Sequence, residues 1–466
     1  MLYGALGISL MNSRIICLAY GLVCLLSSSG IAGESNVAAE QALAHYVAKP
    51  DDSHAWQVVQ RAPLGMSEYL EIKMTSQTWR GIPWKHQLFI ILPSQVDPST
   101  KHAMLFITGG SWRTEMDRDD FRQRIPRVAA LFAAVAEQQK TPVAILLQVP
   151  FQPLFDGKYE DAIIAYTFEE FLKTGDSQWP LLLPMVKAAV RGMDVVQTAC
   201  QDYLDIGIET FTVTGASKRG WTTWLTGAVD PRATAIAPIV IDVVNMGPQM
   251  RHQKSVWGKF SHEIDDYTSR DLPKRLETPR GRELQLIVDP FSYRENLTQS
   301  KLIIIGTNDP YWPVDALNLY WDQLLGQKHI LYVPNQGHGI KDFVRLTSTL
   351  NEFHRRAGEG KFLPQLKWNY KQNGRLVDFS VSSDEPTQTL RIWTARSETR
   401  DFRDSHWSDQ VVKPVDGRYG ESFALPQEGF VATFAEAVYA AVPVPFFLST
   451  KLVVLNRSGF DRAVPQ

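Results

Sequence analysis

The chain has 466 residues, of which 44% are hydrophobic and 21% charged, and 48 Lys plus Arg nearly balance 50 Asp plus Glu, for a formal net charge of −2. This composition is that of a globular protein with a large core, and it excludes the strongly basic balance typical of nucleic-acid-binding proteins. No His-Glu-x-x-His, paired Cys-x-x-Cys or P-loop pattern occurs, so we expect no metal ion, nucleotide or other cofactor.

Residues 1–32 differ in composition from the rest of the chain. Arg14 precedes an apolar run over residues 15–26, and small residues follow over 27–32. This pattern predicts a signal peptide cleaved after Ala32, with Met11 as an alternative start, and hence an exported protein that is periplasmic or secreted. An uncleaved anchor is the alternative, but the run is short for a membrane span, which needs ~20 residues, so we expect no stable span after cleavage. Two of the three cysteines lie in this segment, which leaves Cys200 without a partner for an intramolecular disulfide.

After this leader, predicted strands and helices alternate along the chain, which indicates an α/β fold. We expect a short helical lead-in over 34–61 and two strands, 69–76 and 86–92, on either side of a turn at 79–83. The further predicted elements are a strand at 103–107, a helix at 121–139, a strand at 142–149, a helix around 160–166, a helix at 184–203, and strands at 211–214 and 235–242.

The turn after the strand at 211–214 carries a candidate nucleophile, Ser217. The strand leads into Gly-Ala-Ser-Lys-Arg-Gly, and a helix can continue from Trp221. A strand, a tight turn of small residues, a Ser and a helix form the nucleophile elbow of α/β-hydrolases, and the helix N-terminus suits a developing oxyanion. The pattern departs from Gly-x-Ser-x-Gly, because the second Gly comes one residue late and Arg219 stands in its place. An ordinary strand-to-helix turn is the alternative for this stretch alone.

The order of residues downstream favours the hydrolase. A buried strand at 301–305 is followed by Asp309, and a strand at 329–333 is followed by His338. The chain order Ser, acid, His is that of an α/β-hydrolase triad, and open α/β sheets place their sites at the carboxyl ends of strands. We therefore predict Ser217 as nucleophile, His338 as general base and Asp309 as the residue that orients the imidazole, with Asp315 as a nearby alternative acid.

Two backbone regions are candidate donors of an oxyanion hole. The amide of Lys218 follows the nucleophile, and the loop 108–112 follows the strand at 103–107. The paired glycines of this loop let backbone N–H groups face a ligand, so Gly110 or Ser111 is expected to supply the second donor. A plain glycine turn is the alternative.

Basic and aromatic residues beside these motifs are candidates for substrate binding. Lys218 and Arg219 adjoin the nucleophile and favour an anionic substrate, with a structural ion pair of Arg219 as the alternative. Trp112 and Trp312 are candidate pocket residues, with the alternative that such tryptophans belong to the core. The substrate classes that remain open are a small molecule, a carbohydrate ester or a peptide.

The chain divides into regions of different composition. Residues 33–360 form the predicted α/β-hydrolase domain, in which the insertion 243–293 is expected to cover the site as a cap or, alternatively, to be a peripheral helical excursion. From residue 361 to 466 short stretches alternate apolar and polar residues, as at 366–371, 376–382, 389–394, 430–434 and 448–455. This pattern predicts a small C-terminal antiparallel β domain resembling a sandwich.

Several motifs together make the chain resemble the PhoPQ-activated pathogenicity-related proteins. The resemblance covers roughly residues 40 to 460, and its motifs are 151–154, 160–166, 179–194, 215–222, 289–293, 306–309, 333–338, 393–396, 401–403 and Trp407. It implies export, control by an envelope-sensing two-component system, and a link to virulence or to resistance against cationic peptides. It does not imply a substrate. The turn at 215–220 also resembles that of glucuronoyl esterases, in which a basic residue follows the nucleophile as Lys218 does here.

These observations predict an exported serine hydrolase that acts on an ester or amide. A prolyl-peptidase-type enzyme is less well supported, because no N-terminal propeller is indicated. The alternative from another class is a secreted binding or signalling protein that keeps a hydrolase scaffold without turnover. A complete Ser-Asp-His set argues against that alternative, and covalent labelling by a fluorophosphonate would separate the two.

Overall fold

The computed structural model describes residues 38–461, apart from positions 119, 123, 416 and 417. Their main feature is a sheet of 15 strands, whose hydrogen-bonded path runs β1-β2-β3-β5-β4-β6-β7-β8-β9-β17-β16-β12-β13, with β18 and β19 attached beside β16. The predicted signal peptide, residues 1–32, lies outside the described residues. None of the helices in the described part of the chain combines the length and the apolar character needed to cross a bilayer.

The strands of this sheet are β1 (Ala55–Leu64), β2 (Ser67–Trp79), β3 (Ile82–Leu92), β4 (His102–Ile107), β5 (Val143–Leu146), β6 (Thr210–Ala216), β7 (Ala233–Ile239), β8 (Ser300–Gly306), β9 (Lys328–Val333), β12 (Thr389–Ser397), β13 (Ser408–Val412), β16 (Phe430–Tyr439), β17 (Phe446–Ser449), β18 (Val453–Asn456) and β19 (Gly459–Phe460). The middle strands, from β5 through β9, are parallel, whereas β1, β2 and β3 pair antiparallel with one another and β3 pairs antiparallel with β5. Runs rich in Val, Ile and Leu form these middle strands because both of their faces are buried.

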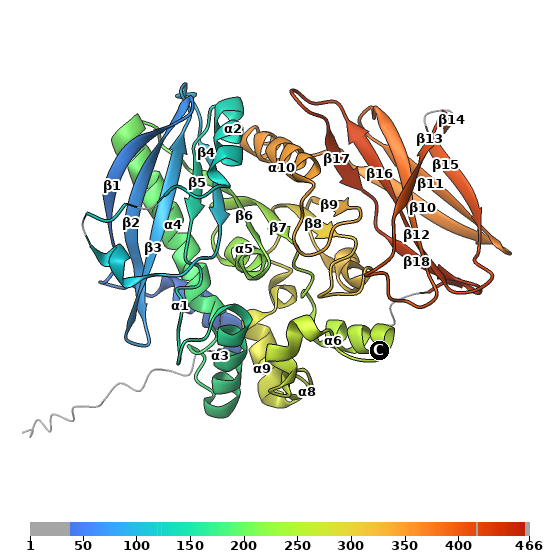
Figure 1. Ribbon diagram of the computed structural model, residues 1–466, viewed down its shortest axis with the longest axis horizontal. Helices are drawn as coiled ribbons and strands as arrows, with labels where there is room; N and C mark the ends of the chain where they lie inside the picture. Colours follow the sequence, from blue (N-terminus) through green and yellow to red (C-terminus); the bar gives the residue numbers. More distant parts are fainter. Residues whose placement is uncertain (1–37, 119, 123, 416–417, 462–466) are drawn as a thin grey trace, which may run out of the picture. The chain divides into compact units, whose positions relative to one another are not determined.

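Helices cover both faces of the sheet (Figure 1). Their bounds are η1 (Ala39–Gln41), α1 (Ala42–Ala48), η2 (Thr114–Asp117), α2 (Ala129–Gln139), α3 (Glu160–Thr174), α4 (Leu182–Leu204), α5 (Lys218–Val229), α6 (Met246–Trp257), η3 (His262–Ile264), α7 (Asp265–Thr268), α8 (Leu272–Arg275), α9 (Pro279–Val288), η4 (Pro290–Tyr293), η5 (Ala316–Leu319), η6 (Trp321–Gln323) and α10 (Phe343–Gly358). One apolar core lies between the sheet and α1, α4 and α5, and a second lies between the other face and α2 and α10. With β2-β3-β5-β4-β6-β7-β8-β9 as its central strand order, this is the predicted α/β-hydrolase fold.

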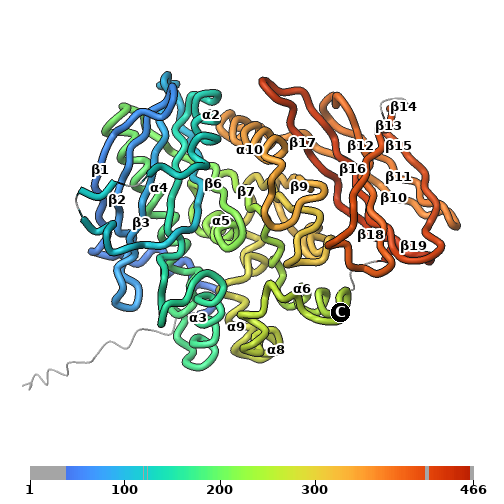
Figure 2. Tube along the Cα trace, in the orientation of Figure 1, coloured from blue at the N-terminus to red at the C-terminus, as the bar shows by residue number. Residues whose placement is uncertain are grey.

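The C-terminal strands extend the central sheet. β17 pairs antiparallel with β9 through Ser449 and Ile330, and β16, β12 and β13 follow outward. A second, four-stranded antiparallel sheet consists of β10 (Leu366–Asn373), β11 (Leu376–Ser383), β15 (Arg418–Ala424) and β14 (Pro414–Val415). Figure 2 shows both groups in the red part of the chain. The predicted C-terminal antiparallel sheet is therefore present, while the division of the chain into domains at residues 360 and 361 stays a prediction.

Three predicted elements differ from the structure, each for an identifiable reason. Residues 55–61 are not helical, because β1 pairs along its length with β2 in a hairpin whose turn lies at Gly65 and Met66. The helix predicted from residue 121 begins only at Ala129. Pro126 prevents an earlier start, because a proline cannot continue a helix from the preceding turn. The Ala129 amide donates to the Pro126 carbonyl just before the helix. The stretch 448–455 forms two strands, β17 and β18, both antiparallel to β16, because one extra residue between Ser449 and Val453 interrupts the pairing. At this break the Thr450 amide donates to the Ala435 carbonyl, and the Thr450 hydroxyl accepts the Ala435 amide.

Candidate active site

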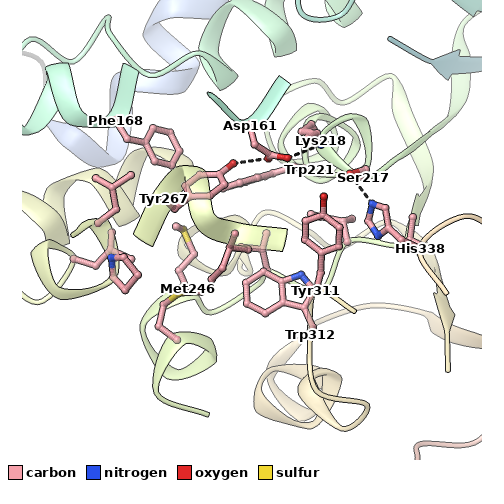
Figure 3. Close-up of a pocket in the computed structure, with 18 residues that line it drawn as sticks. Asp161, Phe168, Ser217, Lys218, Trp221, Met246, Tyr267, Tyr311, Trp312 and His338 are labelled. Atoms are coloured by element: carbon pink, nitrogen blue, oxygen red, sulfur yellow. Dashed lines mark hydrogen bonds and ion pairs between the residues drawn. The ribbon is translucent and has the colours of Figure 1, made fainter. Parts of the chain in front are cut away.

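Ser217, His338 and Asp309 form a continuous hydrogen-bonded chain. The His338 Nδ1 lies 2.9 Å from Asp309 Oδ2, and the His338 Nε2 lies 2.9 Å from Ser217 Oγ. An ionised carboxylate only accepts hydrogen bonds, so Nδ1 carries the proton and Nε2 is left to accept the Ser217 hydroxyl. Figure 3 shows the His338 ring directed at Ser217.

The fold brings these residues together at the carboxyl ends of three parallel strands, β6, β8 and β9. Ser217 lies between β6 and α5 with φ +58° and ψ −127°, an unfavourable conformation for a residue with a side chain, as expected in a nucleophile elbow. Asp309 follows β8, and its Oδ1 accepts the Tyr311 amide at 2.9 Å, which holds the carboxylate in place. His338 follows β9 and is 25% exposed at its side chain, whereas Asp309 is buried. The alternative acid, Asp315, instead bonds His252 and Arg400, each at 2.8 Å.

The late second glycine of the elbow has a steric reason. A Cβ on Gly220 would lie 2.5 Å from Ile241 Cγ2 and 3.0 Å from the carbonyl oxygen of Ile239. A Cβ on Gly215 would lie 2.9 Å from the carbonyl oxygen of Ile107. Both glycines are therefore required for the close approach of α5 to the strands, and Arg219 fits between Ser217 and Gly220 because its side chain turns elsewhere.

Arg219 does not reach the space beside Ser217, which corrects its predicted role in substrate binding. Its Nη1 and Nη2 each lie 2.6 Å from a different oxygen of Glu160, its Nε donates to the Val149 carbonyl, and the residue is 8% exposed. Burial of Glu160 opposes its ionisation, but the hydrogen bonds and charge of Arg219 hold the Glu160 pKa below its usual value. Arg219 is thus bound in a structural ion pair.

Lys218 lines the cavity beside Ser217, but its charge is compensated. Its Nζ lies 2.6 Å from Asp161 Oδ2, and the Tyr267 hydroxyl donates to Asp161 Oδ1 at 2.8 Å (Figure 3). Lys218 is also the first residue of α5, so its amide belongs to the leading N–H groups that have no acceptor within a helix. The amide of Lys218 stays a predicted oxyanion donor, and its side chain forms an ion pair with Asp161 in the cavity wall.

The glycine loop after β4 is connected to the nucleophile helix by a relay of bonds. Gln152 donates to the Gly110 carbonyl at 3.2 Å and to Glu160 at 2.8 Å, and Glu160 in turn holds Arg219. Gly110 has φ +123°, a conformation that favours glycine. The roles of Gly110 and Ser111 as oxyanion donors remain predictions, and the relay shows how their loop is held relative to Ser217.

The two predicted pocket tryptophans lie in different places. Trp312 is 7% exposed and lines the cavity beside Ser217. Trp112 does not line this cavity, which corrects its predicted role: its indole donates to Asp117 at 3.2 Å and borders a separate depression with Lys85 and Met116. Trp112 was proposed as a pocket residue because it lies in the loop 108–112, but this position determines only where its backbone lies. Its side chain turns toward Asp117 in η2.

The cavity beside Ser217 and His338 is almost entirely apolar and has a volume of about 60 Å³. Eight of the lining residues come from the insertion 243–293, namely Val243, Met246, Met250, Ile264, Tyr267, Leu272, Pro273 and Leu276. Others come from α3, as Asp161 and Phe168, and from Tyr311, whose ring lies 4.2 Å from that of His338. Burial and the charge of Asp161 raise the Tyr311 pKa, so this hydroxyl stays protonated.

Sequence reasoning missed Asp161, Tyr267 and Tyr311 as parts of the site. Asp161 adjoins Glu160 in the first turn of α3, and a pair of acidic residues there resembles ordinary helix-end charge. Tyr311 lies two residues after Asp309, which is the signal that could have found it. Within the ranges that the structure describes, no group of three or more His, Cys, Asp or Glu side chains is arranged to hold a metal ion.

Comparison with known proteins identifies the family. Residues 43–403 match the model of the PhoPQ-activated pathogenicity-related proteins, and the chain therefore belongs to this family. It is 32% identical over 432 residues to the "Autocrine proliferation repressor protein A" of Dictyostelium discoideum, covering 84% of this chain and 85% of that protein. Solved structures with a similar fold include the acetyl xylan esterase from Paenibacillus sp. R4 (13% identity, TM-score 0.46, 67% of this chain and 91% of that one). Acetyl xylan esterase 1 from Thermoanaerobacterium sp. JW/SL YS485 is another (15% identity, TM-score 0.45, 68% and 93%).

Proposed function

We propose that this protein is an exported serine hydrolase that cleaves an ester or amide through Ser217, His338 and Asp309. The observation that carries the proposal is the pair of 2.9 Å contacts that join the three side chains in the order needed for proton transfer. Ser217 is a weak nucleophile without a base, and the His338 Nε2 within hydrogen-bond distance supplies one. Asp309 fixes the tautomer of His338 and stabilises the imidazolium.

The reaction follows from these positions. Ser217 Oγ attacks the substrate carbonyl carbon while His338 Nε2 takes its proton, and the carbonyl oxygen becomes an oxyanion. The Lys218 amide and an amide of Gly110 or Ser111 donate to this oxyanion. His338 then passes the proton to the leaving oxygen or nitrogen, which leaves an acyl group on Ser217. Water, deprotonated by His338, attacks the acyl carbon and releases the acid, and Ser217 recovers its proton.

Export and biological role are further parts of the proposal. The signal-like composition of residues 1–32 supports secretion or a periplasmic location. Sequencing of the mature N-terminus should begin near Gly33, whereas an intact leader in the membrane fraction would favour an anchored protein. The family description supports a link to pathogenicity, for which resistance to cationic peptides is one form.

A second candidate function is that of a secreted signalling protein without turnover. It is favoured by the relative from Dictyostelium discoideum, whose name describes an autocrine repressor of proliferation. The intact Ser-His-Asp geometry favours the hydrolase instead, because a scaffold without turnover has no need of it.

A fluorophosphonate separates the two candidates. The wild-type protein should be labelled, Ser217→Ala should not, and Ser348→Ala on the outer face of α10 should be labelled like the wild type. Wild-type protein that stays unlabelled would contradict the hydrolase and leave the signalling candidate.

A further inference from the structure

Two apolar spaces of different size meet at His338. The first is the enclosed cavity of about 60 Å³ beside Ser217. The second is a groove of about 250 Å³ between α2 and α10. Its walls are formed by Phe106, Val128, Leu131, Phe132, Val135, Ala216, Ile239, Val240, Gly339, Ile340, Phe343, Leu346, Thr347 and Leu350. Both spaces are bordered by His338 and Val240, and the first is also lined by Ser217.

The groove is apolar, and two large side chains on its walls are exposed. Phe343 is 51% exposed and Leu131 is 37% exposed, and both lie on its walls. Large apolar side chains that stay exposed beside a functional site commonly contact a ligand. Among the described residues that form the groove walls, only His338 carries an ionisable side chain. In the enclosed cavity the ionisable pair Lys218 and Asp161 neutralises itself.

Resting on the proposed function, we propose that the substrate is a neutral ester of a short apolar acid with a larger apolar alcohol, the acyl group in the enclosed cavity and the alcohol in the groove. The assignment of each half follows from the chemistry of Ser217 and His338. The acyl carbon becomes bonded to Ser217 Oγ, and only the enclosed cavity is lined by Ser217. The leaving oxygen receives its proton from His338, which the groove borders without Ser217.

The volumes set the expected selectivity. A cavity of about 60 Å³ holds an acyl chain of a few carbons and excludes a long one, because the surrounding core is tightly packed. The groove, at about 250 Å³, has room for an aryl or extended alkyl alcohol. Each methylene of the alcohol that enters the groove should add to transition-state binding, by roughly threefold in kcat/KM per methylene if burial is nearly complete.

The test uses two series of neutral esters with the full mature chain. One series is p-nitrophenyl esters from acetate to octanoate, and the other is acetates of straight-chain alcohols from methanol to octanol. In the first series kcat/KM should be highest for acids of two to four carbons and fall at least tenfold by octanoate. In the second it should rise with alcohol length. A rise with acyl length combined with no dependence on the alcohol would overturn the assignment, and so would two flat series.

Variants isolate the two spaces. Met250→Ala enlarges the enclosed cavity, and it should shift the acyl optimum to longer chains without changing the alcohol series. Phe343→Asp, at an exposed position, and Thr347→Trp, which fills the groove, should both flatten the alcohol series. Because p-nitrophenol is itself an aryl alcohol, both variants should lower kcat/KM across the p-nitrophenyl series by a similar factor and leave its optimal acyl length unchanged. Leu325→Asp, also exposed but bordering neither space, is the matched control and should change neither series.

Two other outcomes are informative. If Phe343→Asp changes the sedimentation coefficient and leaves the alcohol series unaltered, the groove is a surface between copies of the chain and the proposal is wrong. If fluorophosphonate does not label Ser217 at all, the proposed function itself fails. Labelling with normal efficiency but flat ester series overturns only the substrate assignment.

Discussion

The guanidinium of Arg219 and the carboxylate of Glu160 form a two-point ion pair, with both N–O distances at 2.6 Å. The guanidinium also lies so close to Gly109 that a Cβ there would be 2.3 Å from Nη2. The residue two places after the nucleophile is therefore packed against the loop that carries the predicted oxyanion donors. On the proposed function, Arg219 is predicted to be a positioning residue that acts through this loop rather than by touching substrate.

Glu160→Gln should lower kcat and leave KM nearly unchanged. The substitution keeps the shape of the side chain but leaves the Arg219 charge without its partner, so the Gly110 loop loses a fixed support and oxyanion stabilisation weakens. We expect a fall in kcat of roughly 10- to 100-fold, within the range for loss of an oxyanion donor. The free energy of unfolding should fall by about 1–2 kcal/mol, less than for a fully buried pair because the Glu160 side chain is 35% exposed.

Steady-state kinetics and urea unfolding of the same variant check this prediction. Glu359→Gln, which removes an exposed ion pair with Arg355, is the control and should leave kcat unchanged. A rise in KM at constant kcat would instead place Arg219 and Glu160 in ground-state binding of the substrate.

Asp309→Asn and Asp315→Asn should separate catalysis from stability. Asp309 bonds His338, so its amide variant favours the wrong tautomer and should lower kcat by about 10⁴-fold with little change in folding. Asp315 bonds His252 and Arg400, so its variant should lose about 3–5 kcal/mol of stability, because a buried partner is removed, while kcat of the folded protein stays near wild type. Steady-state kinetics and urea unfolding of both variants check this prediction. If Asp315→Asn lowers kcat more than Asp309→Asn does, Asp315 is the acid that orients His338.

Much of this fold could be predicted from local sequence, and the orientation of the basic residues could not. Strands β8 and β9 are recognisable in the sequence as apolar runs, and the structure buries them. The triad was predicted from the order of Ser217, Asp309 and His338 along the chain and from their positions after strands. The partners of Lys218 and Arg219 lie on α3, and Glu160 is 59 residues upstream of Arg219. No local pattern connects such distant residues, so the sequence suggested an anionic substrate where the structure has two compensated charges. β1 was missed for another reason: it is the first strand of a hairpin with β2, and the turn at Gly65 that forms this hairpin was not recognised in the sequence.

Lys218 should not select for anionic esters. Its charge is balanced by Asp161, so the wild type should prefer a neutral ester over an equally sized anionic one. Lys218→Met leaves the Asp161 carboxylate unbalanced, and it should lower kcat/KM for the anionic ester several-fold more than for the neutral ester. The double variant Lys218→Met with Asp161→Asn should restore the wild-type ratio. If the double variant also loses activity selectively on the anionic ester, Lys218 contacts the substrate anion directly.

Asp242→Asn should stabilise the protein at alkaline pH and not at acid pH. Asp242 follows β7 and is buried, and its Oδ1 has no hydrogen-bond partner among the described residues. Burial, together with the charges of Asp309 and Asp315, raises the Asp242 pKa from 3.8 to about 7. The folded state thus binds this proton more tightly than the unfolded state does, so the contribution of Asp242 to stability is greatest below pH 4 and declines as the pH rises toward 7.

The amide of the Asp242→Asn variant cannot ionise, so the variant should gain up to roughly 4 kcal/mol in free energy of unfolding over the wild type at pH 8 and nearly nothing at pH 4. Urea unfolding of both proteins at these two pH values measures the difference, with the exposed Asp404→Asn as a control that should show no such pH dependence. A difference between wild type and Asp242→Asn that stays constant from pH 4 to pH 8 would show that Asp242 titrates alike in the folded and unfolded chains.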